Sequence, residues 1–185
     1  ICRIIAASDL PKLPPIAITE LFARPKGREH TTYIEVFNPT ESPVDLYGYE
    51  LLVYTNTKEA VGEPKGRIPF AREAGTILGA SESVAVWPLT LKNYHPDVNC
   101  LTAEDFIKSL NGAYFYSKDP IDEAKTRILP LDLTEIDPEK GTRKHIEGIC
   151  TLPIGHEPTT LLIVPRGGDA SSAVFTLVYS DCYAE

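Results

Sequence analysis

Prolines and glycines constrain what this chain can fold into more than any other feature of its sequence. Sixteen prolines and twelve glycines are spread over 185 residues. Proline lacks a backbone donor and glycine favours turns, so both residues interrupt helices and strands. The apolar segments between them are short, which excludes a helix bundle. A chain of this length suits one domain, and we expect that domain to be rich in β-strands.

The apolar segments alternate as strands do. In residues 32–37, Ile34 and Val36 lie on one face and Tyr33 and Glu35 on the other, and β-branched and aromatic residues favour strands. Similar segments recur at a spacing of roughly 10 to 15 residues, which is typical of an all-β sandwich. The predicted strands cover residues 16–22, 32–37, 49–55, 67–70, 76–78, 83–89, 160–164 and 173–179.

Two of these strand predictions are more detailed than the others. The alternation of the first strand breaks after Glu20, so we expect a β-bulge there. Residues 160–164 (TLLIV) form a nearly continuous apolar run, and we therefore expect them to be buried on both faces. We also expect them to form a hairpin with residues 173–179 through a turn at Gly167–Gly168.

Two segments do not follow the strand pattern. Residues 8–15 (SDLPKLPP) are rich in proline, which favours extended backbone, so we assign residues 1–15 to an N-terminal connector and residues 16–185 to the sandwich. We interpret residues from about 92 to 150 as a mixed, partly helical insertion. Residues 102–110 predict a short helix there, with a capping threonine, acidic residues in the first turn and one apolar face.

Three motifs in the first half of the chain follow one another in a fixed order. They are Ile18-Thr19-Glu20, then Tyr33 to Pro39 (YIEVFNP), then Val44 to Leu51 (VDLYGYEL). In this order they resemble the strands of the lamin tail domain, which typically read I-x-E, W/F-I-E-L/I-x-N and V-D-L-S-G-W-x-L. Residues 70–86 and 160–179 are similar to the later strands of that family. The chain therefore resembles a lamin tail domain of the bacterial type.

The resemblance implies an immunoglobulin-like β-sandwich. It also implies a set of structural motif residues, which are Glu20, Glu35, Asn38, Asp45 and Gly48. Tyr49 stands where the family usually has tryptophan, and the insertion has no counterpart there. In nuclear lamins the domain is a protein-interaction module, and in bacteria it is an accessory domain of secreted nucleases, phosphoesterases and surface proteins. The resemblance therefore implies an interaction role.

The carboxylates of the motif form the first candidate site. Glu20 and Glu35 lie on neighbouring predicted strands, and Asp45 follows in the next segment. Such carboxylates can bind a metal ion or act as an acid–base pair. They can also lie on a solvated sheet face, while side-chain oxygens of Asn38 and Asp45 bind turn amides. We favour the structural interpretation and predict no catalytic residue, no cofactor and no metal ligand.

The remaining acidic residues, histidines and cysteines show none of the spacings typical of a site. The acidic residues of the insertion lack the pattern of a calcium loop, although calcium stays an alternative for them. The histidines, at 30, 95, 145 and 156, form no catalytic motif. The four cysteines lie far apart in the sequence: Cys2, Cys100, Cys150 and Cys182. They either form two disulfides, with the pairing open, or stay free thiols.

Tyr114, Phe115 and Tyr116 are the candidate binding surface. Three consecutive aromatic residues within an insertion are difficult to place in a core, and rigid aromatic rings suit recognition. Tyr49 and Trp87 instead lie in alternating strand segments, so we expect these two rings in the core.

These observations favour a non-catalytic interaction or accessory module rather than an enzyme. We expect it to be part of a larger secreted or cell-surface bacterial protein, in which it docks a protein partner or positions an attached catalytic domain. The net charge of −8 opposes binding of nucleic acid by the chain itself. No apolar run approaches the ~20 residues of a membrane helix, so we expect no membrane insertion.

Two alternatives belong to other functional classes. The first is a carbohydrate- or calcium-binding module of an extracellular hydrolase. The second is a hydrolase that uses dispersed histidine and aspartate residues, which the missing motifs disfavour. The oligomeric state stays open at this stage.

Overall fold

A computed structural model describes residues 14–22, 33–55, 57–71, 73–89, 104, 106–107, 127–132, 134–145 and 158–179. In these residues the structure consists mainly of β-strands, with two 3-10 turns and a few helical residues between 104 and 107. The prediction of an all-β chain is therefore confirmed.

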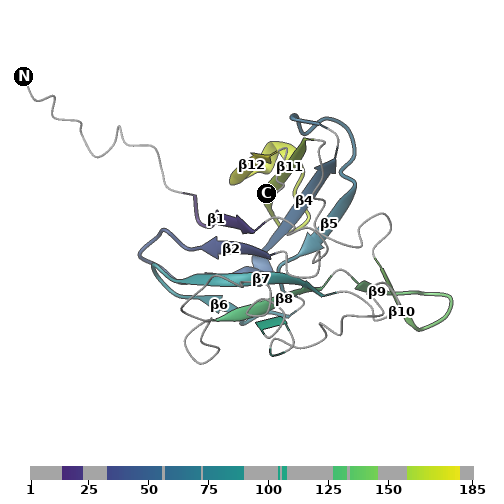
Figure 1. Ribbon diagram of the computed structural model, residues 1–185, viewed down its shortest axis with the longest axis horizontal. Coiled ribbons are helices and arrows are strands. Elements are labelled where there is room, and N and C mark those ends of the chain that lie inside the picture. The colour runs from purple at the N-terminus through teal and green to yellow at the C-terminus, as the bar shows by residue number, and fades with distance from the viewer. Residues whose placement is uncertain are drawn as a thin grey trace, which may run out of the picture.

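The first large sheet has four strands in the order β1-β2-β7-β8 (Figure 1). Its strands are β1 (Ala17–Phe22), β2 (Tyr33–Phe37), β7 (Ser83–Leu89) and β8 (Ile128–Asp132). β1 and β7 both run antiparallel to β2, whereas β8 runs parallel to β7. The register of β1 against β2 shifts between Ile18 and Glu20. This shift is the predicted bulge, placed one residue earlier than the sequence indicates.

The second large sheet has four antiparallel strands in the order β12-β11-β4-β5. Its strands are β4 (Tyr49–Thr55), β5 (Gly66–Pro69), β11 (Thr159–Pro165) and β12 (Phe175–Tyr179). β4 and β11 are the central strands, and both are buried on both faces over most of their length. The prediction of a doubly buried strand at 160–164 is confirmed.

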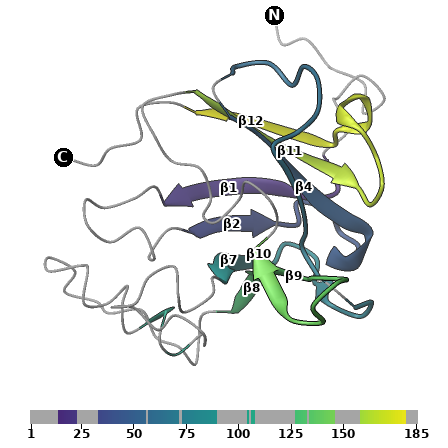
Figure 2. The ribbon, with the colours of Figure 1, turned by 90° about the vertical axis from the view of Figure 1, so that its right-hand side faces the viewer.

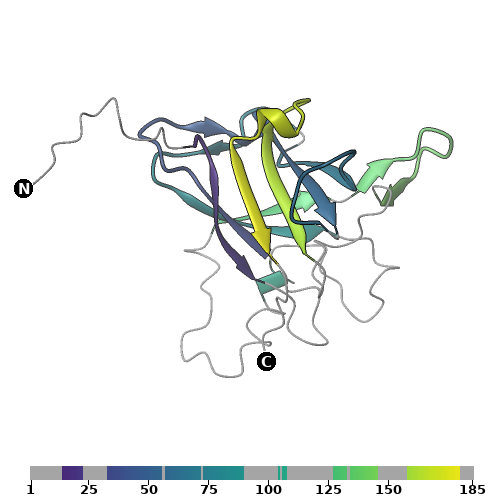
Figure 3. The same ribbon diagram turned by 90° about the horizontal axis from the view of Figure 1, so that it is seen from above.

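Two smaller strand pairs and two 3-10 turns complete the described structure. β3 (Val44–Asp45) pairs with β6 (Ile77–Leu78), and the turn η3 (Leu46–Gly48) follows β3 directly. β9 (Thr134–Ile136) pairs with β10 (Arg143–His145), and this green hairpin projects away from the two large sheets (Figure 3). The second turn is η4 (Ala170–Ser172), between β11 and β12.

The core lies between the two large sheets, which are seen one above the other in Figure 2. Ile34 and Val86 face it from the first sheet, and Leu51 and Leu161 face it from the second. All four are at most 1% exposed. Because side chains of both sheets form one cluster, removal of apolar surface from water holds the sheets together.

Each large sheet also carries apolar side chains on its outer face. On the second sheet, Leu52 and Tyr54 of β4 pack with Leu162 and Val164 of β11 in a separate cluster. On the first sheet, Trp87 is 1% exposed and its ring stacks on Phe106 at 5.5 Å between centroids. The predicted burial of Trp87 is confirmed, although it lies on the outer face of its sheet and not between the sheets.

Two sequence predictions need correction. The turn between β11 and β12 is not a simple Gly167–Gly168 turn, because the connection runs from Arg166 to Val174 and contains η4. The segment 92–150 contains the strands β8, β9 and β10, which the sequence did not predict. Of the predicted helix 102–110, Glu104, Phe106 and Ile107 are described, and all three are helical.

Candidate functional site

An open groove of about 240 Å³ lies on the outer face of the second sheet. Residues 62–64, from the connection between β4 and β5, form one wall, and residues 169–171, at η4, form the other. Leu52 and Tyr54 of β4 form its floor. Because the walls are connections held on a rigid sheet, the groove has the placement typical of binding sites.

The floor of the groove is apolar because β4 has apolar residues on both of its faces. Leu51 and Val53 face the core between the sheets, and Leu52 and Tyr54 face outward. Leu52 is fully buried and Tyr54 is 4% exposed. Neighbouring outward residues of β11 and the half-buried Ala170 complete this packing. The floor is therefore fixed by the same strands that build the core.

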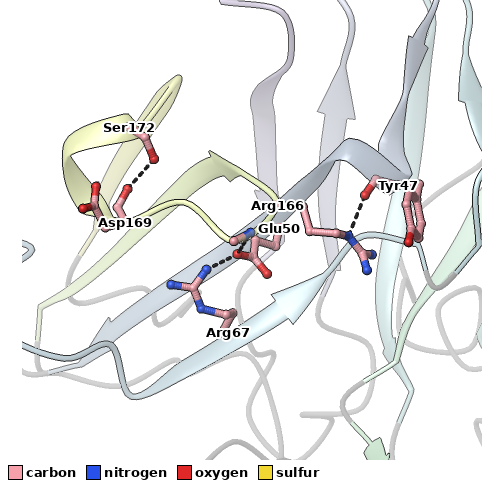
Figure 4. A network of polar contacts seen from close by, with 7 residues as sticks. Tyr47, Glu50, Arg67, Arg166, Asp169 and Ser172 are labelled. Carbon is pink, nitrogen blue, oxygen red and sulfur yellow. Dashed lines mark hydrogen bonds and ion pairs between the residues drawn. The ribbon is translucent and has the colours of Figure 1, made fainter.

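A buried carboxylate connects one wall of the groove to the sheet. Glu50, 5% exposed, forms an ion pair with Arg67 of β5 and accepts a hydrogen bond of 2.8 Å from the backbone nitrogen of Gly167 (Figure 4). Burial of a carboxylate is costly unless it is paired and hydrogen-bonded. Glu50 satisfies this condition, and Arg67, which also lines the groove, has its charge compensated by the pair.

Asp169 shapes the same wall, at η4. Its Oδ1 accepts hydrogen bonds from the Ser171 hydroxyl at 2.6 Å and from the Ser171 backbone nitrogen at 3.0 Å, so it caps η4. The same two bonds hold the pKa of Asp169 below its usual value, so the side chain is an anion at neutral pH. Gly168 precedes it in a tight turn, with its backbone nitrogen 2.8 Å from the Pro165 oxygen.

Arg166 fixes the base of this wall. Its guanidinium carbon lies 3.9 Å from the centroid of the Tyr47 ring, and its Nε donates to the Tyr47 backbone oxygen at 2.7 Å (Figure 4). Its Nη2 donates to the Ala71 backbone oxygen at 2.5 Å. A cation over an aromatic ring is stabilised by the ring quadrupole. These contacts tie the end of β11 to η3 and to the end of β5.

Within the part of the chain that the structure describes, Glu63 and Asp169 are the acids of the groove without a cationic partner. Glu63 is exposed on the wall between β4 and β5, and Asp169 is exposed at η4. The described ion pairs are Arg67 with Glu50 and Arg127 with Glu82. The groove thus combines an apolar floor, one compensated cation and two uncompensated anions.

The candidate carboxylates Glu20 and Glu35, for which the sequence favoured a structural role, lie on the first sheet, away from the groove. Glu20 is paired with Glu35 across β1 and β2. The Thr19 hydroxyl donates to Glu35 at 2.5 Å, and the Tyr33 hydroxyl donates to Glu20 at 3.0 Å. Glu20 is exposed and Glu35 is half-buried. Both carboxylates are thus on the solvated outer face of the sheet.

Asn38 and Asp45 both bind turn backbone. The Asn38 amide, fully buried, donates to the backbone oxygens of Ser42 and Gly79 at 2.8 and 2.9 Å. Asp45 accepts from the backbone nitrogens of Gly75 and Tyr47 at 2.9 and 3.0 Å, and these bonds lower its pKa. No described contact joins Asp45 to Glu20 or Glu35.

Gly48 shows no steric need for glycine. A Cβ atom there would meet no heavy atom within 4 Å, and Gly48 is absent from the glycines with positive φ. Its backbone oxygen accepts a bond of 2.8 Å from Arg166, which any residue could do.

Several predicted residues lie outside the described part of the chain. These are the aromatic cluster Tyr114, Phe115 and Tyr116 and all four cysteines. Among described residues, no group of three or more histidine, cysteine or acidic side chains could hold a metal ion. The same residues contain no helix long and apolar enough to cross a membrane.

Sequence reasoning did not find the groove. Its floor comes from β4 and its walls come from two connections more than a hundred residues apart in the sequence. One signal was available in the sequence. The residues of β4 are apolar on both faces of the strand, which indicates that the outer face of its sheet is covered. Comparison with known proteins gives no further guide, because no protein-family model matches this chain and no curated protein is similar to it.

Proposed function

We propose that this chain is a non-catalytic interaction module that docks a protein partner in the groove over β4. The observation that carries this proposal is the groove itself, with its fixed apolar floor and walls that are connections between strands. Pre-formed concave sites with apolar linings and a few polar groups are typical of binding. We further propose that the module serves a larger secreted or cell-surface protein, as the lamin tail resemblance implies.

An immunoglobulin-like fold is the finer architecture that we propose. Immunoglobulin domains place strands A, B and E in one sheet and strands C, F and G in the other. The order β1-β2-β7 corresponds to A-B-E, and the order β12-β11-β4 corresponds to G-F-C. The parallel strand β8 then takes the place next to E, which is a departure from the usual antiparallel strand D. The strand order supports the fold that the sequence motifs imply.

The hydrogen bonds of the carboxylate side chains also support a binding role over a catalytic one. The carboxylates with shifted pKa values, Asp45, Glu82 and Asp169, each bind backbone amides of a turn. A carboxylate held as a cap by such bonds is poorly placed to transfer protons. The carbohydrate- or calcium-binding alternative stays a second proposal, without a described contact that favours it.

A peptide-display selection against the folded chain tests the docking site. The variant Ser171→Trp places a large ring on the wall of the groove, and Ser42→Trp makes the same change at an exposed turn that does not line the groove. We expect selected peptides to lose at least tenfold in affinity for Ser171→Trp, which is about 1.4 kcal/mol. They should keep their affinity for Ser42→Trp.

Two results would contradict the docking proposal. One is a selection that yields no binding peptide. The other is a set of peptides whose affinities for the two tryptophan variants are equal, because their binding would then not involve the groove.

A further inference from the structure

We propose that the groove over β4 receives a basic side chain, lysine or arginine, from the partner segment. This inference rests on the proposed function and specifies the chemistry of the partner. It draws on three properties of the groove, which are its size, its floor and the sign of its uncompensated charges.

The size of the groove favours one side chain. Pockets that hold drug-sized ligands measure roughly 300–1,000 Å³. The groove, at about 240 Å³, lies below that range. It is also open along the sheet surface between the two walls, so a segment that runs over it can insert one residue.

The floor and walls suit a long aliphatic stem. Leu52, the ring of Tyr54, Pro64 and Ala170 line the groove, and all four present carbon. Lysine and arginine bury their methylene groups along apolar surface and keep the charged head at the water. Leu52 and Tyr54 are already almost fully buried, so the apolar surface that the stem can cover comes mainly from the half-buried Pro64 and Ala170.

The charges at the rim select a cation. Glu63 and Asp169 stand on opposite walls, and no described cation pairs with either. The bonds from Ser171 lower the pKa of Asp169 below its usual value, so it stays an anion throughout the neutral range. A basic head group between the walls has an acid on each side of it, and charge-assisted hydrogen bonds to carboxylates are stronger than neutral ones.

Arg67 does not reverse this preference. Its guanidinium is paired with the buried Glu50, which also receives the Gly167 backbone nitrogen. An anionic ligand would have to share Arg67 with the buried Glu50, which already compensates its charge. It would also meet the fields of Glu63 and Asp169 and of a chain with net charge −8.

Amino-acid amides are suitable probes for this inference. L-arginine amide carries the guanidinium, and L-citrulline amide has nearly the same shape with a neutral head. In NMR titrations of the folded chain we expect arginine amide to shift the backbone amides of Leu52, Ala170 and Ser171. Citrulline amide should shift them at least about fivefold more weakly, and added salt should reduce the difference, because screening weakens exposed charge interactions.

Charge variants locate the effect. Asp169→Asn removes the charge of one wall and keeps the oxygen that caps η4. Glu63→Gln removes the charge of the other wall. Each variant should lower the affinity for arginine amide about two- to fivefold. Glu59→Gln is the matched control: it lies exposed on the same connection as Glu63 but does not line the groove, and it should keep the wild-type affinity.

The inference is overturned if arginine and citrulline amides bind equally, or if Glu59→Gln weakens binding as much as the groove variants. It is also overturned if the displayed peptides bind in the groove but carry no basic residue. That last result would leave the docking proposal intact, so the two failures are distinguishable.

Discussion

Asn38 is a buried polar residue with an unusually complete set of partners. Its side chain donates to the backbone oxygens of Ser42, Leu78 and Gly79 and accepts from the nitrogen and hydroxyl of Thr40. It thereby joins the turn after β2 to the end of β6. A buried side chain with this many bonds fixes two segments at once.

Asn38→Ala should therefore lower the free energy of unfolding by about 2–4 kcal/mol, because several buried backbone groups lose their partner. Urea denaturation measures this loss through the midpoint at constant slope. Ser42→Ala, at an exposed side chain in the same turn, should stay within about 0.5 kcal/mol of the wild type. Equal effects of the two variants would show that the turn as a whole, not the Asn38 amide, sets the stability.

We expect substitution by alanine to have opposite outcomes at Gly168 and Gly48. A Cβ atom on Gly168 would collide with Ser172 Oγ and lie 2.8 Å from the Pro165 backbone oxygen, whereas one on Gly48 would meet open space. We expect Gly168→Ala to cost about 1–3 kcal/mol, since the backbone of the turn must shift. Gly48→Ala should be within about 0.5 kcal/mol of the wild type. A thermal scan of both variants shows whether either position needs glycine for steric reasons.

The turn carboxylates predict acid sensitivity. Backbone bonds from Gly75 and Tyr47 lower the pKa of Asp45 in the folded state below its usual value of 3.8. A lowered pKa means that the unfolded state binds more protons, so the stabilisation is present above the unfolded pKa and is lost as pH falls through the folded value. Glu82, paired with Arg127, and Asp169 act in the same direction.

Stability should thus fall between roughly pH 5 and pH 2. Asp45→Asn keeps an oxygen acceptor but does not titrate, so its free energy of unfolding should fall less steeply over that range. The difference in the free energy of unfolding between wild type and variant should be largest at neutral pH and should disappear at low pH. Urea titrations at several pH values measure it, and parallel curves for the two proteins would contradict the role given to Asp45.

At the scale of the elements, short apolar segments bounded by turn residues predicted every strand of the two large sheets except β8. β2 and β4 are examples: both have β-branched or aromatic residues and turn residues at their ends, and both lie within a residue of the predicted bounds. Their positions in the chain follow from hydrophobic burial, which a sequence pattern carries directly.

β8 could not be predicted in this way. Its sequence, ILPLD, contains a proline and ends in an acid, so its alternation is not visible. It also pairs parallel to β7, and no local turn connects the two. β9 and β10 are short and charged, and their pairing depends on the turn at Gly141, which has a positive φ. Edge and hairpin strands of this kind are determined by their partners rather than by their own pattern.

The candidate site was beyond local reasoning for a similar reason. The groove depends on Asp169 of the β11–β12 connection standing opposite Glu63 of the β4–β5 connection. Their proximity follows from the pairing of β11 with β4, which strand patterns do not specify. The sequence instead pointed to Tyr114, Phe115 and Tyr116, which lie outside the described residues. Glu20 and Glu35, for which we favoured a structural role, lie on the outer face of the other sheet.

The helical residues near Phe106 act as an anchor on the first sheet. Phe106 is fully buried, stacks on Trp87 and meets Tyr33 edge to face with 6.3 Å between centroids. Phe106→Ala should cost about 3–5 kcal/mol, which is typical for loss of a buried ring. It should also shift the fluorescence of Trp87 to longer wavelength. Phe106→Leu, which keeps most of the volume, should cost clearly less, and equal costs for both would contradict the packing role.

At the scale of the whole molecule, one core joins the two large sheets. Side chains from β1, β2 and β7 form a single cluster with side chains from β4, β5 and β11. Neither sheet can keep its inner face buried without the other. A structure of this kind is expected to unfold as one unit, because small domains with a shared core lose it in a single step.

Fluorescence can test this cooperativity with one reporter on each sheet. Trp87 is the single tryptophan of the chain and reports on the first sheet. A second protein, Trp87→Phe with Tyr49→Trp, places the ring on β4, where Tyr49 already packs against the core. Within each protein, the urea midpoint from tryptophan fluorescence should coincide with that from far-ultraviolet circular dichroism, which reports on both sheets. If fluorescence at Trp87 or at residue 49 instead changes at a different urea concentration from the dichroism, the two sheets unfold separately, and the shared core does not couple them.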